Sequence, residues 1–377
     1  MQKIKIGDVC DVLNGFAFKS ENYVGSGIRV IRIANVQKGY IEDTTPAFYP
    51  LDSGGLDKYM IENGDLLMSL TGNVGRVAML EADMLPAALN QRVACLRLKS
   101  SKISKKYLFH ILNSDYFEQQ CIQSSKGVAQ KNMSTEWLKD YEIPLYSPEH
   151  QNKIVSVLDR VHLIINTQKK QLQKLDELVK ARFVELFGDP ILNQKQFPVY
   201  RMDEVVEFQG GSQPDKKFFE YEPTDDNIRL IQIRDYKTDK FITYIPRAMA
   251  KRFCTADDIM IGRYGPPIFQ ILQGIEGSFN VALMKATPKK GNKEFVRQFL
   301  KQECLLDYLE GMSKRTAGQD GIQMDKLKAY PFPLPPVELQ NQFEKFVNQV
   351  DKSKVAVQKS LDEAQLLFDS LMQQYFG

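Results

Sequence analysis

The chain is 377 residues long, 43% of them hydrophobic and 26% charged, with a net charge of +3. This length allows two or more domains, and the composition is that of an ordinary globular protein. No apolar run approaches the roughly 20 residues that span a bilayer, and the N-terminus lacks the ~7–15-residue apolar core of a signal peptide. We therefore expect a cytoplasmic protein with no membrane contact. The small net charge neither requires nor excludes a nucleic-acid partner.

Five cysteines are scattered along the chain, and no two of them form a C-x-x-C pair. Such spacing indicates reduced thiols, used as small core residues. It argues against both a zinc site and a disulfide framework, so no metal is expected. The cysteines are Cys10, Cys95, Cys121, Cys254 and Cys304.

The first part of the chain, to about residue 140, reads as a β-rich domain with some helix. Glycine and turn residues separate four short β-type runs: Ile28–Ile33, Leu66–Leu70, Val74–Leu80 and Val93–Leu98. Apolar residues at helical spacing predict one packed helix over Lys105–Gln123. His110 lies in that helix, where a lone histidine is far more often packed or exposed than a ligand or base.

A second type of segment follows, from Tyr141 to Gly188. It opens with a Pro-rich lead-in, continues with Glu149, Gln151 and Asn152 as Glu-x-Gln-Asn, and runs on as apolar heptads to Leu-Phe-Gly. The same plan returns from Tyr330 to the C-terminus and ends in Tyr-Phe-Gly. Because the copies are roughly 190 positions apart, the chain is predicted to be a tandem duplication.

The residues between these segments repeat the first domain loosely. IRLIQI echoes IRVIRI, Gly210-Gly211 echoes Gly15, and Asn280 echoes Asn90. The match is tightest just before the lead-ins, where Gln130 aligns with Gln319 and Tyr141 with Tyr330. The duplicated lead-ins and helices are therefore predicted to carry two domains whose sequences have diverged.

The heptads predict a coiled-coil seam in each helical segment. Each helix is expected to be about 33 residues, or roughly 50 Å, long. A chain with one domain between the helices can pair them antiparallel. The predicted fold class is thus α+β, with two similar β-rich domains held apart by two long antiparallel helices and related by a pseudo-two-fold axis. The predicted boundaries are 1–143 and 189–332 for the domains, and 144–188 and 333–377 for the helices.

Two domains about 50 Å or somewhat less apart suit a DNA target in two halves, since half-sites one turn apart lie roughly 34 Å from each other. Basic clusters also recur in both domains, around Arg97–Lys106 and Lys285–Lys301. Nearby amides and aromatics could contact bases or position phosphates, although Asn90 and Asn280 could equally cap a turn. The candidate DNA-binding residues are Arg76, Asn90, Arg92, Lys126, Gln130, Lys131, Asn132, Arg234, Arg263, Tyr264, Lys314, Arg315 and Gln319.

The pattern of a variable domain followed by LKDYEIPLYSPEHQNKI and a heptad helix, occurring twice, resembles the specificity subunit of type I restriction–modification systems. The resemblance covers essentially the whole chain and is most specific at the two lead-ins. It implies a non-catalytic subunit whose two target-recognition domains each read one half of a bipartite double-stranded DNA sequence.

The resemblance further implies that the helices space the domains and bind two modification (methyltransferase) subunits, and restriction subunits through them. S-adenosylmethionine would then belong to the partner, and this chain would need no cofactor. The helix residues implied in spacing or docking are Leu158, Val161, Ile165, Leu172, Leu175, Val347, Val350, Val357, Leu361 and Phe368.

Two other classes of function remain as alternatives. A stand-alone methyltransferase would need a D/N-P-P-F/Y tetrapeptide, and the nearest string, Gly265–Ile268, lacks both the amide or acid and the aromatic residue. A nuclease could use Asp257 and Asp258, but the first copy has Gly64 and Asp65 there, with no E-x-K downstream. The third class is a coiled-coil scaffold without DNA binding, against which the diverged β-rich domains argue.

Overall fold

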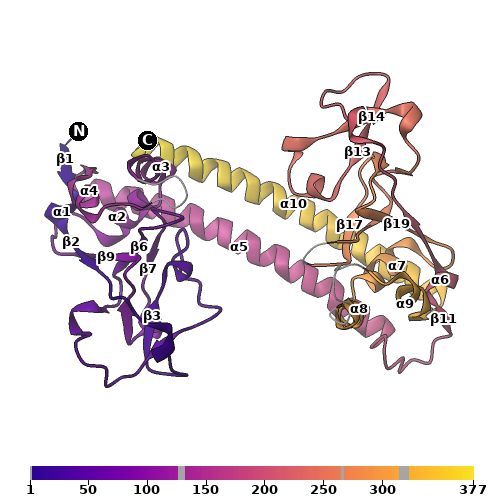
Figure 1. Cartoon of the computed structure of the whole chain (residues 1–377), viewed down its shortest axis with the longest axis horizontal. Helices are drawn as coiled ribbons and strands as arrows, with labels where there is room; N and C mark the ends of the chain where they lie inside the picture. The colour runs from indigo at the N-terminus through magenta and orange to yellow at the C-terminus, as the bar shows by residue number, and fades with distance from the viewer. Residues whose placement is uncertain (1, 126–131, 265–266, 314–321) are drawn as a thin grey trace. The chain divides into compact units, whose positions relative to one another are not determined.

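The computed structural model describes residues 2–125, 132–264, 267–313 and 322–377 (Figure 1). The chain divides into two compact units. Unit 1 consists of Met1–Lys170 and Gln358–Gly377, and unit 2 of Gln171–Val357. Each unit therefore contains one β-rich region together with a part of both long helices.

Unit 1 is built on two four-stranded sheets. One has the strand order β2-β9-β6-β7 and is antiparallel throughout; the other has the order β4-β3-β8-β5, with β3 and β8 parallel. The run predicted from Val74 gives a strand only from Val77, because Gly72 and Gly75 have positive φ angles that suit a turn. The strands are β2 (Cys10–Asn14), β3 (Ile28–Ile31), β4 (Phe48–Tyr49), β5 (Met60–Ile61), β6 (Leu66–Ser69), β7 (Val77–Met79), β8 (Ala87–Leu89) and β9 (Val93–Leu98).

Unit 2 repeats this topology strand for strand. Its sheets have the orders β12-β19-β16-β17 and β14-β13-β18-β15, and β13 and β18 are again parallel. The loose echoes in the sequence thus correspond to a shared topology. The strands are β12 (Val206–Gly210), β13 (Asn227–Ile231), β14 (Tyr244–Pro246), β15 (Phe253–Cys254), β16 (Ile259–Gly262), β17 (Gln270–Gln273), β18 (Gly277–Phe279) and β19 (Leu283–Pro288).

The Pro-rich lead-ins form strands that close each domain. β10 (Glu142–Leu145) pairs antiparallel with β1 (Gln2–Lys5), and β20 (Pro331–Pro333) pairs in the same way with β11 (Val199–Arg201). These are two-stranded ladders, so every strand is an edge strand, where a residue without a backbone N–H is tolerated. The first and last strands of each domain therefore lie side by side.

Short helices cover the antiparallel sheet of each unit. The single helix predicted over Lys105–Gln123 is wrong: the structure has two helices, because the Ser114 side chain accepts the N–H of Phe117 and caps a new helix. The helices of unit 1 are α1 (Ile6–Val9), α2 (Lys105–Leu112), α3 (Asp115–Ser124) and α4 (Thr135–Asp140). Those of unit 2 are α6 (Met202–Val205), α7 (Lys293–Leu300), α8 (Glu303–Ser313) and α9 (Met324–Ala329).

Short 3-10 helices lie in the connections between strands. They are η1 (Ser20–Asn22), η2 (Ile33–Asn35), η3 (Asp57–Tyr59), η4 (Ala82–Met84), η5 (Lys216–Phe218), η6 (Ile233–Tyr236), η7 (Asp239–Phe241) and η8 (Arg247–Met249).

The two long helices are α5 (Pro148–Phe187) and α10 (Val337–Phe376), each of 40 residues rather than about 33. They run antiparallel within each unit. In unit 1, Val161 and Ile165 pack against Ala364, and Gln168 donates to Ser360. In unit 2, Lys354 pairs with Asp176 at 2.7 Å.

The long helices also complete the cores of both units. Ile154 and Leu158 of α5, with Met372 and Phe376 of α10, belong to the core beneath the antiparallel sheet of unit 1. In unit 2 the same role falls to the other ends of the helices, including Phe183 and Phe187 of α5 with Phe343 of α10. Neither helix is therefore only a connector.

The cysteines are free thiols, and all but Cys304 are buried, as expected for small core residues. Within the described ranges, no helix is long and apolar enough to cross a membrane.

Candidate nucleic-acid interface

In unit 1, three separate segments meet at the end of the β6–β7 hairpin. The Ser69 N–H donates to the carbonyl of Arg76 at 3.0 Å, and the Leu70 N–H donates to the carbonyl of Arg92 at 3.0 Å. The Leu70 carbonyl accepts the N–H of Met133, beside a β-bridge between Thr71 and Asn132. The backbone ladder thus brings Arg76, Arg92 and Asn132 to one edge, which we call the β6–β7 edge.

The side chains at this edge differ in their freedom. Arg92 and Asn132 are exposed. Arg76 is half-buried, and its Nη1 donates to the side-chain oxygen of Gln37 at 2.5 Å. The Arg76 guanidinium is therefore held in place, whereas the exposed Arg92 side chain can reach a phosphate or base. Gln37 is a positioning residue that sequence reasoning missed, since it lies 39 positions from Arg76.

Unit 2 has an equivalent edge on the β16–β17 hairpin. The Arg263 N–H donates to the carbonyl of Ala282 at 2.9 Å, as Leu70 does to Arg92 in unit 1. The Arg263 guanidinium lies over the ring of Tyr264, 5.4 Å from its centroid, and Tyr264 is 46% exposed. A cation and an aromatic face are thus presented together, a combination suited to stacking on a base.

Arg234 lies elsewhere in unit 2. It sits on η6, where its Nη2 donates to Thr243 at 3.1 Å and its guanidinium packs over Phe241. The candidates Lys126, Gln130, Lys131, Lys314, Arg315 and Gln319 all fall outside the described residues.

Asn90 and Asn280 occupy equivalent turns, and each caps its own turn. The side-chain oxygen of Asn90 accepts the N–H of Arg92 at 3.3 Å, and that of Asn280 accepts the N–H of Ala282 at 3.1 Å. A Cβ on Gly15 would lie 2.2 Å from the carbonyl carbon of Asn90, and one on Gly211 would lie 1.9 Å from the carbonyl oxygen of Asn280. The recurring Gly and Asn therefore mark a place where two backbone segments cross closely. Asn90 thus has a structural role in addition to any contact with DNA.

Many charges of the recurring basic clusters are used inside the fold. Arg97 makes a two-pronged pair with the buried carboxylate of Asp65, at 3.1 and 2.6 Å. Other members pair with carboxylates: Lys99 with Asp11, Lys106 with Asp159, Lys285 with Asp258 and Lys293 with Asp257. Paired cations offer less to a phosphate than free ones. The clusters therefore contribute less to a DNA surface than their sequence suggests.

The side chains of Asp257 and Asp258 are engaged as well. Asp257 pairs with Lys293, and Asp258 accepts the N–H of Thr255 at 2.8 Å. Among the residues that the structure describes, no three His, Cys, Asp or Glu side chains are grouped to hold a metal ion.

A second feature recurs in both units as a groove beside a long helix. In unit 1, a cavity of about 390 Å³ lies between the α2–α3 corner and α10, lined by Asn113–Tyr116 and by Gln365, Asp369 and Gln373 among others. In unit 2, a cavity of about 600 Å³ lies between the α7–α8 corner and α5. We call these the helix grooves. They could not be found from the sequence, because they depend on where the short helices break.

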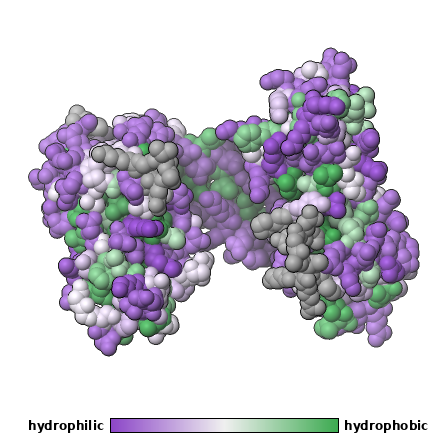
Figure 2. All heavy atoms as spheres, in the orientation of Figure 1, coloured by the Kyte–Doolittle hydropathy of each residue, from purple (hydrophilic) through white to green (hydrophobic). Residues whose placement is uncertain are grey.

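The helix residues implied in docking fall into two groups. Leu158, Val161, Ile165, Val347 and Val350 are buried, whereas Leu172, Leu175, Val357, Leu361 and Phe368 are half-buried. Other apolar residues of α5 and α10 reach the surface between hydrophilic ones (Figure 2). These exposed residues are Val157, Leu163, Ile164, Leu178, Val184, Val337, Val355, Leu366 and Leu367.

Two similar mixed domains, each closed by a lead-in strand and completed by the same two long helices, define a duplicated α+β protein. Its two halves match the model of the type I restriction modification DNA specificity domain, over residues 1–177 and 194–364. The chain belongs to this family.

Curated relatives agree with this assignment. The chain is 29% identical over 184 residues to the type I restriction enzyme MjaVIII specificity subunit of Methanocaldococcus jannaschii, a match that covers 47% of this chain and 43% of the relative. It is 30% identical over 190 residues to the EcoAI specificity subunit of Escherichia coli, covering 47% of this chain and 32% of the relative. The matches therefore span less than half the length of these relatives.

The fold is shared with solved structures over the whole chain. The S subunit of a type I restriction-modification system from M. genitalium matches with a TM-score of 0.57 and 16% identity, covering 100% of this chain and 96% of the other. A structure described as the basis of complex assembly and conformational transition of the type I R-M system matches with a TM-score of 0.55 and 17% identity, covering 100% and 97%.

Proposed function

We propose that this chain is the DNA-recognition subunit of a type I restriction–modification complex, and that each β-rich domain reads one half of a bipartite double-stranded DNA target. The family membership supports this role. The observation that carries it is the recurrence of the hairpin edge: Arg92 with Asn132 in unit 1, and Arg263 with Tyr264 in unit 2, lie on equivalent parts of the fold. A target with two different half-sites requires two domains that share a fold and carry different side chains.

The partners in this proposal are two modification subunits, which bring S-adenosylmethionine and the methyl-transfer chemistry, and restriction subunits bound through them. The two helix grooves support two equivalent docking places, one in each unit. Beside them, Leu178 on α5 and Leu367 on α10 occupy the same position of the two copies and are 47% and 51% exposed. The chain itself supplies recognition and positioning in this proposal.

The proposed boundaries give a direct test. Residues 1–143 are replaced by the corresponding domain of another family member, and the chain is expressed with its modification subunits. Sequencing of methylated bases should then show a new sequence in one half-site and the original one in the other. The reciprocal replacement of residues 189–332 should change the other half. A change in both halves from a single replacement would overturn the proposal.

Two outcomes would favour the other classes. Turnover of S-adenosylmethionine by the purified chain alone would indicate an enzyme. A complete complex that shows no sequence preference would indicate a scaffold. Such a scaffold would meet DNA only through its partner subunits.

A further inference from the structure

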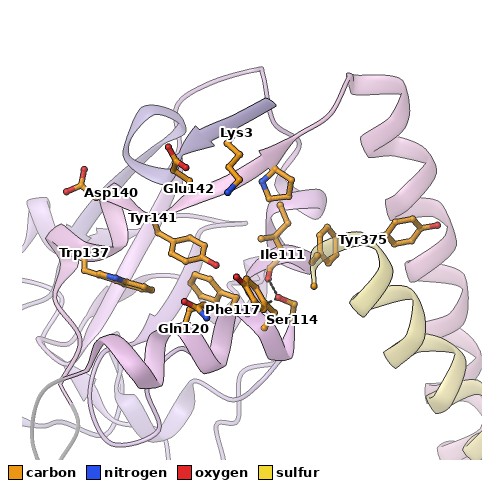
Figure 3. Close-up of a pocket in the computed structure, with 14 residues that line it drawn as sticks. Lys3, Ile111, Ser114, Phe117, Gln120, Trp137, Asp140, Tyr141, Glu142 and Tyr375 are labelled. Carbon is orange, nitrogen blue, oxygen red and sulfur yellow. Dashed lines mark hydrogen bonds between the residues drawn. The ribbon is translucent and has the colours of Figure 1, made fainter. Parts of the chain in front are cut away.

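An open cavity of about 420 Å³ lies in unit 1 where the last turn of α10 meets α3, α4 and the β1–β10 ladder (Figure 3). Its walls are largely aromatic, with Phe117, Trp137 and Tyr141 on one side and Tyr375 and Phe376 on the other. Lys3, Asp140 and Glu142 stand at the polar part of its lining. We call this the α10-end cavity. It lies apart from the β6–β7 edge, whose residues line no part of it.

Unit 2 has walls of the same kind at the equivalent place, around the end of α5. Four wall positions correspond: Phe187 to Phe376, Gly188 to Gly377, Phe299 to Ile111 and Pro333 to Pro144. Both long helices also end in the same way. The Gly188 N–H donates to the carbonyl of Val184 at 2.8 Å, and the Gly377 N–H donates to that of Gln373 at 2.9 Å.

The space in unit 2 is filled by the segment that follows α5. Only about 10 Å³ remains among the walls, and Asp189, Pro190, Asn193 and Phe197 are themselves part of the lining. The Asn193 side chain accepts the N–H of Phe197 at 3.0 Å and donates to its carbonyl at 2.8 Å. This clamp fixes Phe197, which packs against the core of unit 2.

The strand register aligns the two ladders beside these cavities. The Pro198 carbonyl accepts the N–H of Leu334 at the start of the β11–β20 ladder, and Gln2 faces Leu145 in the corresponding place of the β1–β10 ladder. Gln2 is thus the counterpart of Pro198. Residues 189–197 lead into this ladder in unit 2, and no described residue of unit 1 fills the corresponding space of the α10-end cavity.

From this comparison we infer that the α10-end cavity is a docking site for a peptide segment of a partner chain with the chemistry of residues 189–197. Such a segment carries a proline and, several residues later, a phenylalanine that inserts among Ile111, Pro144 and Phe376. The apolar walls supply the burial that holds the phenylalanine, as they do for Phe197 in unit 2. This inference does not rest on the proposed role in DNA recognition.

The test uses a synthetic peptide with the sequence of residues 189–198, DPILNQKQFP. Trp137 is the only tryptophan of the chain and lines the cavity, and the peptide contains none. Titration of the peptide into the full chain should therefore give a saturable change in Trp137 emission. A peptide with serine in place of the phenylalanine should bind at least about tenfold more weakly.

Two neighbouring glutamines of α3 provide a matched pair of variants. Gln120 lines the cavity, so Gln120→Tyr should obstruct it and weaken binding by at least about tenfold, whereas the exposed Gln119 lies outside the lining, and Gln119→Tyr should bind like the unaltered chain. The peptide comparison does not depend on how either variant folds. The inference is overturned if neither fluorescence nor calorimetry detects saturable binding. It is also overturned if the affinity is unchanged both by the serine substitution in the peptide and by Gln120→Tyr.

Discussion

The side-chain oxygen of Gln151 accepts the backbone N–H of Ser104 at 2.8 Å, which ties the first turn of α5 to the start of α2. The Gln151 amide nitrogen donates to the carbonyls of Lys102 and Tyr146, both at 2.9 Å. Gln340 repeats the arrangement in unit 2, where it accepts the N–H of Asn292 and donates to the carbonyl of Pro335, both at 2.7 Å. The glutamine of each Glu-x-Gln-Asn motif is therefore a buried clamp between a domain and a long helix.

Replacing this clamp should destabilise unit 1. Gln151→Leu removes the partly buried hydrogen bonds to the backbone groups of Ser104, Lys102 and Tyr146, which should cost about 2–4 kcal/mol. Urea unfolding followed by Trp137 emission measures the loss in unit 1. Gln173→Leu, at an exposed position of the same helix, is the control and should stay within about 0.5 kcal/mol. Equal effects of the two substitutions would show that the clamp carries no stability.

The β6–β7 edge predicts a DNA-binding defect. Arg92→Glu should weaken binding of the assembled complex to its target by about 1–3 kcal/mol, because an exposed cation beside the DNA becomes an anion. Fluorescence anisotropy at constant salt measures this loss. Lys153→Glu, on the exposed face of α5, reverses the same charge and should have little effect. Wild-type affinity of Arg92→Glu would exclude this edge from the interface.

The helix grooves predict a change in stoichiometry. Leu178→Asp and Leu367→Asp should each remove one modification subunit, and the double variant should remove both, because a charge on an apolar contact must be desolvated. Native mass spectrometry counts the subunits. Leu163→Asp is the matched control, since Leu163 is 66% exposed but its counterpart in the second copy is Lys352. Full complexes with both substitutions in place would contradict docking at these positions.

The crossing of Gly15 and Asn90 predicts a further loss of stability. Gly15→Ala places a Cβ 2.2 Å from the Asn90 backbone, so the two segments must separate, at a cost of about 1–3 kcal/mol. Gly25→Ala is the control, because a Cβ there meets no atom within 4 Å. Thermal unfolding monitored by Trp137 emission compares the two. If Gly15→Ala unfolds at the wild-type temperature, the backbone crossing is looser than the structure indicates.

His110 predicts a pH dependence of the stability of unit 1. Burial lowers the pKa of His110 from its ordinary value of 6.5 and outweighs its hydrogen bond to Asp159, which raises the pKa; the positive charge of Lys106 and the nearby His162 lower it further. The unfolded chain therefore binds a proton more readily than the folded one below about pH 6.5. Stability should be full above that pH and fall as the pH drops from 6.5 towards the depressed pKa.

His110→Gln removes the titrating ring while keeping a polar side chain. The midpoint of thermal unfolding, measured at pH 7.5, 6.5 and 5.5, should fall less steeply in the variant than in the unaltered chain. The pKa of Asp159 is lowered in the fold, so its protonation weakens unit 1 only at a pH near or below the ordinary aspartate value of 3.8 and does not confuse this range. Parallel pH profiles would assign the titration to another group.

Much of the fold could be predicted because the signals were local and repeated. The heptads and lead-ins were read from periodicity, and the strand β9 has the predicted bounds, Val93–Leu98. The break between α2 and α3 was missed, since the cap of Ser114 competes with a continuous apolar stripe. The long helices were predicted too short, because their first and last turns are buried in the domain cores and do not look like a coiled coil.

The candidate interface was harder to predict because it depends on contacts between distant positions. The sequence indicated that Asn90 could cap a turn, which it does, but it did not reveal Gln37 holding Arg76. The basic clusters were the least reliable guide. Carboxylates such as Asp65 and Asp159 lie far from Arg97 and Lys106 in sequence and become their partners only in the fold.

The β1–β10 and β11–β20 ladders have a consequence for how such proteins can change. Each ladder fixes the entrance and exit of a domain next to one another, so the chain between them forms a closed loop that leaves and returns at the same place. Because the free energy of closing a loop rises only slowly with its length, insertions and deletions between the two strands need not disturb the ladder or the start of the long helix. A domain of different size could therefore be exchanged by recombination at the two strands. Under the proposed function, one half of the target could then diversify while the other is preserved.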